Sequence, residues 1–198
     1  MDRGEADQWY AVRVKPNCER TAATVLSAKG FEHCLPVYKD RRRWSDRYKT
    51  VELPLFPGYI FCRFDRGRRA AVVATPGVLH VVSFGGVPAP VDAAEVAALQ
   101  AIGGSGLAAE PWPYVEAGQW VRIVEGPIAG VCGIVCGFKS RQRLVVNVTL
   151  LKRAVCVEVD SDWVSPVVER SHPARLVSPA FMPDGYQTGR SLGAVPAR

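Results

Sequence analysis

The sequence lacks the features that mark membrane and secreted proteins. It contains no run of 18 apolar residues, so no segment predicts a membrane-spanning helix. The first residues, Met1 to Glu5, are polar, and no signal peptide follows them. We therefore expect neither a membrane protein nor a secreted one, and the expected location is the cytoplasm.

Patterns for catalysis and for metal binding are equally scarce. The histidines are isolated from one another, at His33, His80 and His172. The six cysteines lie mostly inside apolar patterns, which is typical of reduced, buried thiols. Cys132 and Cys136 would share one face of a strand, but no second pair completes the four ligands of a zinc site. The sequence predicts no enzyme, no bound metal and no cofactor.

Apolar content indicates a globular protein, and the net charge permits an anionic partner. The hydrophobic fraction of 48% in 198 residues suffices for one or two packed domains. The formal net charge is +6, which permits a nucleic acid as partner without requiring one.

The stretch from Pro54 to Phe64 combines a rigid turn with an aromatic strand. Prolines on both sides of Phe56 fix the backbone of the turn, and Gly58 can adopt angles closed to other residues. The following residues alternate, with Tyr59, Phe61 and Arg63 on one face and Ile60, Cys62 and Phe64 on the other. Local chemistry leaves Phe56 open to two interpretations, a core residue or an exposed contact residue.

Around this strand, the first half of the chain mixes helices with strands of an antiparallel sheet. Asn17 is expected to cap a helix over residues 18–29, with Gly30 just beyond its end. Asp92 is expected to cap a later helix that buries Val96, Leu99 and Ile102, and Glu95, three residues on, comes close to a capping box. Strands are expected over 9–14, 31–38, 50–53 and 78–84, and a short helix over 66–74. This pattern predicts an α+β domain.

A basic segment from Lys39 to Lys49 is expected at the tip of a long hairpin. It contains six basic residues with two aromatic residues, Trp44 and Tyr48, between them. One interpretation is a solvated loop. The other is a nucleic-acid contact, in which Arg and Lys neutralise phosphates and an aromatic ring stacks on a base.

The second half of the chain has a different character. A Gly-rich segment opens a flexible linker at residue 103, and Pro111, Trp112 and Pro113 stiffen its far end. Short strands are then expected over 119–124, 131–137, 143–149 and 154–159, and their pattern without helices predicts a small all-β barrel. We expect an N-terminal domain over 8–102, a linker over 103–114, the barrel over 115–170 and a disordered tail over 171–198.

The order of these motifs resembles the NusG family of transcription elongation factors. The N-terminal signature comprises Trp9-Tyr10, Leu55-Phe56-Pro57-Gly58-Tyr59, Thr75-Pro76-Gly77-Val78 and Phe84-Gly85-Gly86. The segments 116–123, 126–130 and 133–135 are similar to its KOW motif. The resemblance covers about residues 8 to 167. It implies an NGN-like antiparallel sheet flanked by helices, linked to an SH3-like KOW barrel.

The resemblance also implies function. The N-terminal domain would dock on the β′ clamp helices of RNA polymerase, reach toward the β subunit and suppress pausing or termination. The residues implied in polymerase binding are Phe56, Pro57, Gly58, Tyr59 and Phe84. The KOW domain would recruit ribosomal protein S10 or Rho, although Leu150, Leu151, Lys152 and Arg153 replace the family's aromatic-glycine pair in the partner-binding loop. The expected protein is a monomer associated with the nucleoid.

Other motifs resemble specialised members of the family. Segments 15–19, 43–47 and 160–164 are similar to the UpxY and LoaP groups, and more distantly to RfaH. Such factors load at chosen operons by reading non-template DNA or nascent RNA. The candidate nucleic-acid contacts are Lys15, Arg20, Thr24, Arg41, Arg42, Arg43, Trp44, Arg47 and Thr75. The alternative is a KOW-type RNA-binding or ribosome-associated protein, which would bind structured RNA without polymerase.

Overall fold

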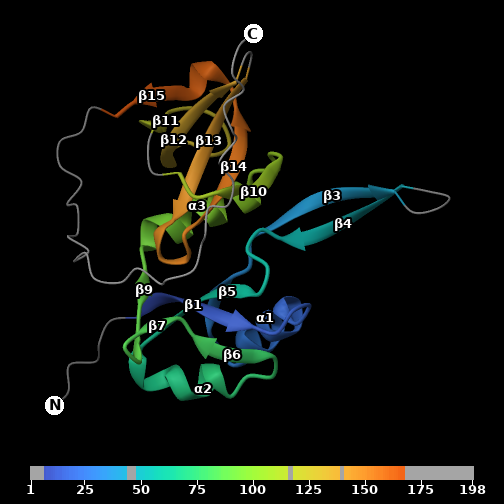
Figure 1. Cartoon of the computed structure of the whole chain (residues 1–198), viewed down its shortest axis with the longest axis vertical. Helices are drawn as coiled ribbons and strands as arrows, with labels where there is room; N and C mark the ends of the chain where they lie inside the picture. The colour runs from blue at the N-terminus through green and yellow to red at the C-terminus, as the bar shows by residue number, and fades with distance from the viewer. Residues whose placement is uncertain (1–6, 44–47, 116–117, 139–140, 168–198) are drawn as a thin grey trace, which may run out of the picture. The chain divides into compact units, whose positions relative to one another are not determined.

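A five-stranded antiparallel sheet organises the N-terminal half. Strand β1 (Gln8–Val14) is central, because it pairs with β5 (Tyr59–Phe64), β6 (Val78–Val81) and β9 (Pro90–Val91), while β2 (Glu32–Cys34) pairs with β5. The computed structural model describes residues 7–43, 48–115, 118–138 and 141–167. The expected tail lies outside these residues, beyond the unit Met1–Val168. The expected α+β fold is confirmed (Figure 1).

Helix α1 (Glu19–Ala28) begins differently from the prediction. Asn17 does not cap it: Cys18 occupies the cap position without a side-chain hydrogen bond, and Asn17 has a left-handed φ of 62°. The carboxylate of Glu19 is buried and accepts a hydrogen bond from the Gly58 amide at 2.8 Å. The first turn of the helix is therefore tied to the proline turn rather than closed by its own cap. The predicted Gly30 terminus is confirmed by a φ of 76°.

The two faces of the sheet pack into different cores. On the α1 side, Ile60, Cys62 and Phe64 are fully buried with Leu26 of the helix. On the opposite side, Phe61 is buried in a second cluster. The alternation expected for this strand is confirmed, because a strand directs successive side chains to opposite faces. The short helix α2 (Arg69–Val73) follows a 3-10 turn at Arg66–Arg68.

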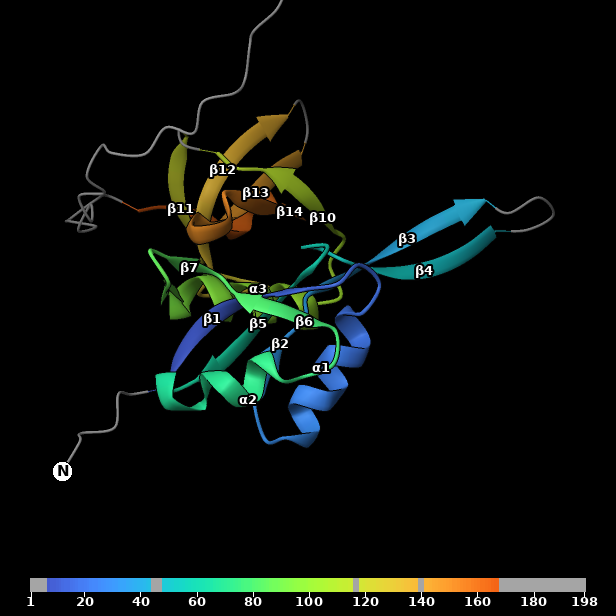
Figure 2. The same cartoon turned by 60° about the horizontal axis from the view of Figure 1, so that its bottom comes forward.

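Two hairpins leave the main sheet. Strands β3 (Val37–Arg43) and β4 (Tyr48–Pro54) pair only with each other among the described residues, and both views show them extending away from the sheet (Figure 2). The expected basic hairpin is therefore confirmed as a hairpin. Strands β7 (Ser83–Phe84) and β8 (Val87–Pro88) form the second hairpin.

The segment expected as a linker is largely ordered. Helix α3 (Ala93–Gly104) includes Gly103 and Gly104, and its Asp92 N-cap is confirmed by a 2.8 Å bond from the Ala94 amide. Strand β10 (Ala109–Pro113) pairs with β14, so most of the expected linker belongs to regular elements. Its backbone groups are satisfied by the neighbouring strand, which residue composition alone does not indicate.

The second half forms a six-stranded antiparallel sheet in the order β10-β14-β13-β12-β11-β15. Four strands match the prediction: β11 (Gln119–Ile123), β12 (Cys132–Phe138), β13 (Arg141–Val148) and β14 (Arg153–Val159). Strands β10 and β15 (Val164–Pro166) were not predicted. No helix among the described residues is long and apolar enough to cross a membrane.

Candidate functional site

The turn predicted to face a partner is buried. Phe56 is only 1% exposed, and its ring meets Phe61 edge-on with 5.4 Å between the centroids. The Tyr59 amide donates to the Phe56 carbonyl at 3.0 Å, which closes the turn, and Gly58 supports it with a φ of 79°. Of the two interpretations left open by the sequence, the core position describes Phe56 in this structure. Pro57 remains exposed and Tyr59 is half-buried.

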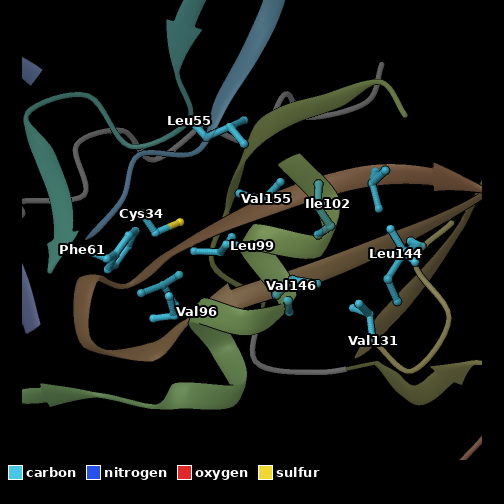
Figure 3. Packing of buried hydrophobic residues seen from close by; sticks show 14 of the residues in the cluster. Cys34, Leu55, Phe61, Val96, Leu99, Ile102, Val131, Leu144, Val146 and Val155 are labelled. Carbon is cyan, nitrogen blue, oxygen red and sulfur yellow. The ribbon is translucent and has the colours of Figure 1, made fainter. Parts of the chain in front are cut away.

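The core that buries this face draws on both halves of the chain. Phe61, Leu55 and Cys34 belong to the same cluster as Val96, Leu99 and Ile102 of α3 (Figure 3). The cluster continues into the barrel strands through Leu144, Val146 and Val155. Helix α3 contacts both β1 and β13. The apolar face of this sheet therefore packs in one core with α3 and with the barrel strands.

Polar contacts accompany this packing. Glu95 of α3 accepts hydrogen bonds from the hydroxyl of Thr149 at 2.6 Å and from its amide at 3.1 Å. Burial raises the pKa of the Glu95 carboxyl, and the donors of Thr149 oppose this shift. Glu95 was expected near a capping box, and its contact 54 residues away has no local sequence signal. Thr149 itself begins the turn that follows β13.

The same turn carries the residues expected to bind a KOW partner. Leu150 and Leu151 pack against the shared core, and Lys152 has a left-handed φ of 49°. The guanidinium of Arg153 lies 5.3 Å from the Tyr59 ring centroid. In this structure the turn therefore faces residues of the N-terminal half.

In contrast to Phe56 in the buried turn, Phe84 is exposed to solvent. It is 69% exposed on the β7–β8 hairpin, where Val87 is 53% exposed. Leu79 of β6 is 46% exposed. The predicted polymerase residues thus divide into a covered group around Phe56 and an open apolar surface at Phe84.

The candidate nucleic-acid residues near α1 differ in accessibility. Lys15 is exposed, whereas Arg20 is paired with Glu52 of β4 at 2.9 Å. The hydroxyl of Thr24 donates to the Arg20 carbonyl at 3.0 Å. Thr75 is only 2% exposed. Its hydroxyl donates to the Ala71 carbonyl and accepts a hydrogen bond from Nζ of Lys29. Thr75 is therefore buried in this structure and does not present a nucleic-acid contact. A threonine that ends a short helix satisfies backbone groups locally, and sequence reasoning missed this role.

The hairpin candidates are only partly described. Arg41, Arg42 and Arg43 lie on β3, where they pair in register with Thr50, Lys49 and Tyr48. Trp44 and Arg47 lie outside the described residues. Tyr48 is 59% exposed on the returning strand. The strands thus place the basic segment at the far end of a hairpin whose base is held to α1 through the Arg20–Glu52 pair.

The cysteines of the described residues are all free thiols. Burial raises the pKa of Cys34 and of Cys62 to about 12. Such thiols remain protonated near neutral pH and are poor nucleophiles and metal ligands. No group of three metal-ligating side chains occurs in the part of the chain that the structure describes.

Comparison with known proteins gives the family. Residues 7–100 match the family model described as "Transcription termination factor nusG". The transcription termination/antitermination protein NusG of Thermus thermophilus is 31% identical over 175 residues, covering 77% of this chain and 95% of the relative. The chain belongs to the NusG family.

A second curated relative agrees with this membership. The NusG protein of Pseudomonas aeruginosa is 26% identical over 178 residues, with 82% of this chain and 99% of the relative covered. A solved structure described as "Domain interaction in Thermotoga maritima NusG" has a TM-score of 0.47 and 20% identity, covering 81% of this chain and 97% of that one. By the family model and the Thermus relative, the protein is a NusG-family transcription termination/antitermination factor.

Proposed function

We propose that this NusG-family factor binds the β′ clamp helices of RNA polymerase through the face around Phe56, Pro57, Gly58 and Tyr59. The observation that carries the proposal is the covering of this face. Phe56 and Phe61 lie in one cluster with Trp9 and Ala11 of their own sheet, and the same cluster includes residues of α3 and of the barrel strands. A face that one partner covers is chemically suited to a second apolar partner.

Polymerase binding then requires the barrel to leave this face. The covered state and the bound state exclude each other, since both use the surface next to Phe61 and Tyr59. Phe84 stays 69% exposed in the covered state, and we assign it to the reach toward the β subunit. Once released, the 149–153 turn becomes free to recruit S10, Rho or RNA.

The β3–β4 hairpin supplies the targeting contact in this proposal. It projects from the sheet, pairs only within itself among the described residues, and carries consecutive arginines at positions 41, 42 and 43. Phosphate contacts from such a hairpin would be salt-dependent, and stacking by an aromatic residue would add preference for an unpaired strand. The ligand is non-template DNA or nascent RNA at chosen operons.

In vitro transcription through a terminator tests the read-through activity and the targeting contact of the β3–β4 hairpin. Read-through should rise with the protein only on templates that carry the leader of its target operon. Replacing Arg41, Arg43 and Arg47 by alanine should abolish this gain, while Arg122→Ala on the barrel should leave it intact. Equal stimulation on every template would make the protein a general elongation factor. No stimulation, together with binding to structured RNA in the absence of polymerase, would favour the RNA-binding alternative.

A further inference from the structure

Two arginines from different halves of the chain converge on one tyrosine. The guanidinium carbon of Arg13, on β1, lies 4.6 Å from the Tyr59 ring centroid. That of Arg153, on β14, lies 5.3 Å from the same centroid. The two cations are therefore within one Debye length of each other, about 10 Å at 0.1 M salt.

Unlike Arg63 and Arg143, these two arginines have no carboxylate partner among the described residues. Arg63 pairs with Glu32 at 3.2 Å, and Arg143 pairs with Glu110 at 3.5 Å. Among the described residues, neither Arg13 nor Arg153 has a carboxylate within salt-bridge distance. The attraction of each cation to the ring offsets part of their mutual repulsion, and an anion bound between them would remove the rest.

The proline turn leaves room for Arg13. A Cβ atom on Gly58 would lie 2.7 Å from Nη1 of Arg13, so any larger residue would displace the guanidinium. The position over Tyr59 thus depends on the glycine at the turn. Because Arg13 belongs to the sheet and Arg153 to the barrel, the pair forms only while the barrel covers the turn.

Arg153 also lines a cleft. Its volume is about 290 Å³, and it is lined by Leu55, Pro57, Pro111, Trp112, Pro113 and Arg153. Three prolines and an indole make flat apolar walls. The guanidinium of Arg143 lies 5.3 Å from the Trp112 ring centroid. The cleft is near the lower end of the size range of small-ligand sites, which starts at roughly 300 Å³.

A cleft with flat apolar walls suits a planar ring, and Arg153 in its lining, with Arg13 beside the same tyrosine, suits a phosphate. Aromatic side chains stack on nucleobases whatever the base, because every base has a π-face. Guanidinium groups bind phosphate oxygens through paired N–H donors. We propose that the covered state binds a nucleotide, with its base in the Trp112 cleft and its phosphate on Arg13 and Arg153. The nucleotide is either free or one unit of a single strand.

This site uses no hairpin residue, so it stands independently of the targeting contact proposed above. Its consequence is a coupling between ligand and conformation. A phosphate that contacts both arginines joins the sheet to the barrel and stabilises the covered state, since a ligand that binds only one state shifts the equilibrium toward it. The nucleotide would therefore oppose the exposure of the Phe56 face.

Binding is tested on the full-length protein by calorimetry at low salt with uridine 5′-monophosphate, uridine, inorganic phosphate and a ten-nucleotide oligouridylate. We expect the monophosphate or the oligonucleotide to bind at least tenfold more tightly than uridine or phosphate alone. Binding of the monophosphate as tight as that of the oligonucleotide identifies a free nucleotide as ligand; tighter binding of the oligonucleotide identifies a strand. Inorganic phosphate binding as tightly as both, or no binding of any probe, overturns the proposal.

Matched variants separate this site from general attraction to a basic protein. Arg153→Gln and Arg13→Gln should each weaken binding roughly tenfold, the loss of one charge-assisted contact. Arg153→Lys should recover part of it, because lysine keeps the charge but not the paired donors. Arg122→Gln removes the same charge from an exposed barrel strand and should have no effect. In hydrogen exchange, the ligand should slow α3 amides in wild type but not in Arg153→Gln; equal behaviour of Arg122→Gln and Arg153→Gln would overturn the proposal.

Discussion

Truncation of Leu99 tests whether the two halves share one core. Leu99 is fully buried on α3, in the cluster that continues into Val146 of β13 (Figure 3). Replacing a buried leucine by alanine removes apolar contacts and leaves a cavity, which typically costs 2–5 kcal/mol. Because α3 contacts both β1 and β13, the cavity in Leu99→Ala would be lined from both sides. We expect a loss of about 3 kcal/mol in the free energy of unfolding by urea.

The matched control is Leu26→Ala. Leu26 is also fully buried on a helix, but its cluster contains only residues of the N-terminal half. Combining each variant with Val146→Ala distinguishes a core shared by both halves from a core confined to the N-terminal half. Leu99→Ala and Val146→Ala should couple by about 0.5–3 kcal/mol, as expected for residues that share a cavity. Leu26→Ala and Val146→Ala should be additive within about 0.5 kcal/mol. Additivity in both pairs would refute the shared core.

Two further predictions concern Glu95 and a barrel glycine. Burial raises the pKa of Glu95 above its ordinary value of 4.5, so the covered state binds more protons than the open state and should weaken as pH rises from about 4.5 through the raised pKa. Hydrogen exchange of the α3 amides measures this weakening, and we expect the pH dependence to disappear in Glu95→Gln. A pH dependence that persists in Glu95→Gln would assign it to another group. Gly126→Ala should destabilise the barrel by more than about 1 kcal/mol in a thermal melt, because Gly126 has a φ of 83° and its new Cβ would lie 2.9 Å from the Trp163 ring. The control is Gly130→Ala, where φ is 91° but the space around the glycine is open. Gly130→Ala should cost less, because it introduces the backbone strain without the clash.

Local patterns in the sequence sufficed for most elements of the fold. The alternation of Tyr59 to Phe64 gave the strand and both of its faces, because strand geometry fixes side-chain direction residue by residue. Asp92 marked the start of α3, because an N-cap is also recognised from the residues next to it. Asn17 misled, because a left-handed backbone and the bond from Gly58 to Glu19 replace its cap. That bond joins residues 39 positions apart, and nothing local signals it.

The site was less predictable than the fold because its geometry depends on long-range packing. Phe56 between prolines was equally consistent with a core and a contact position, and packing with residues far along the chain places it in the core of this structure. Thr75 lies in a motif shared with the family, yet its hydroxyl is used by Ala71 and Lys29. Arg153 was noticed only as part of a loop; its approach to Tyr59 joins strands that are far apart in the chain.

The covering of the Phe56 face has a thermodynamic consequence for polymerase binding. When only a fraction of the molecules presents the binding face, the apparent affinity is reduced by that fraction. If covering is favoured by about 3 kcal/mol, roughly one molecule in 150 is open, and the clamp would bind about 150-fold more weakly than to the uncovered face. A nucleotide on Arg13 and Arg153 would deepen this bias, whereas Leu99→Ala would relieve it. Weakened packing at α3 should therefore strengthen polymerase binding even as it lowers stability, a combination that loss of a direct contact does not produce.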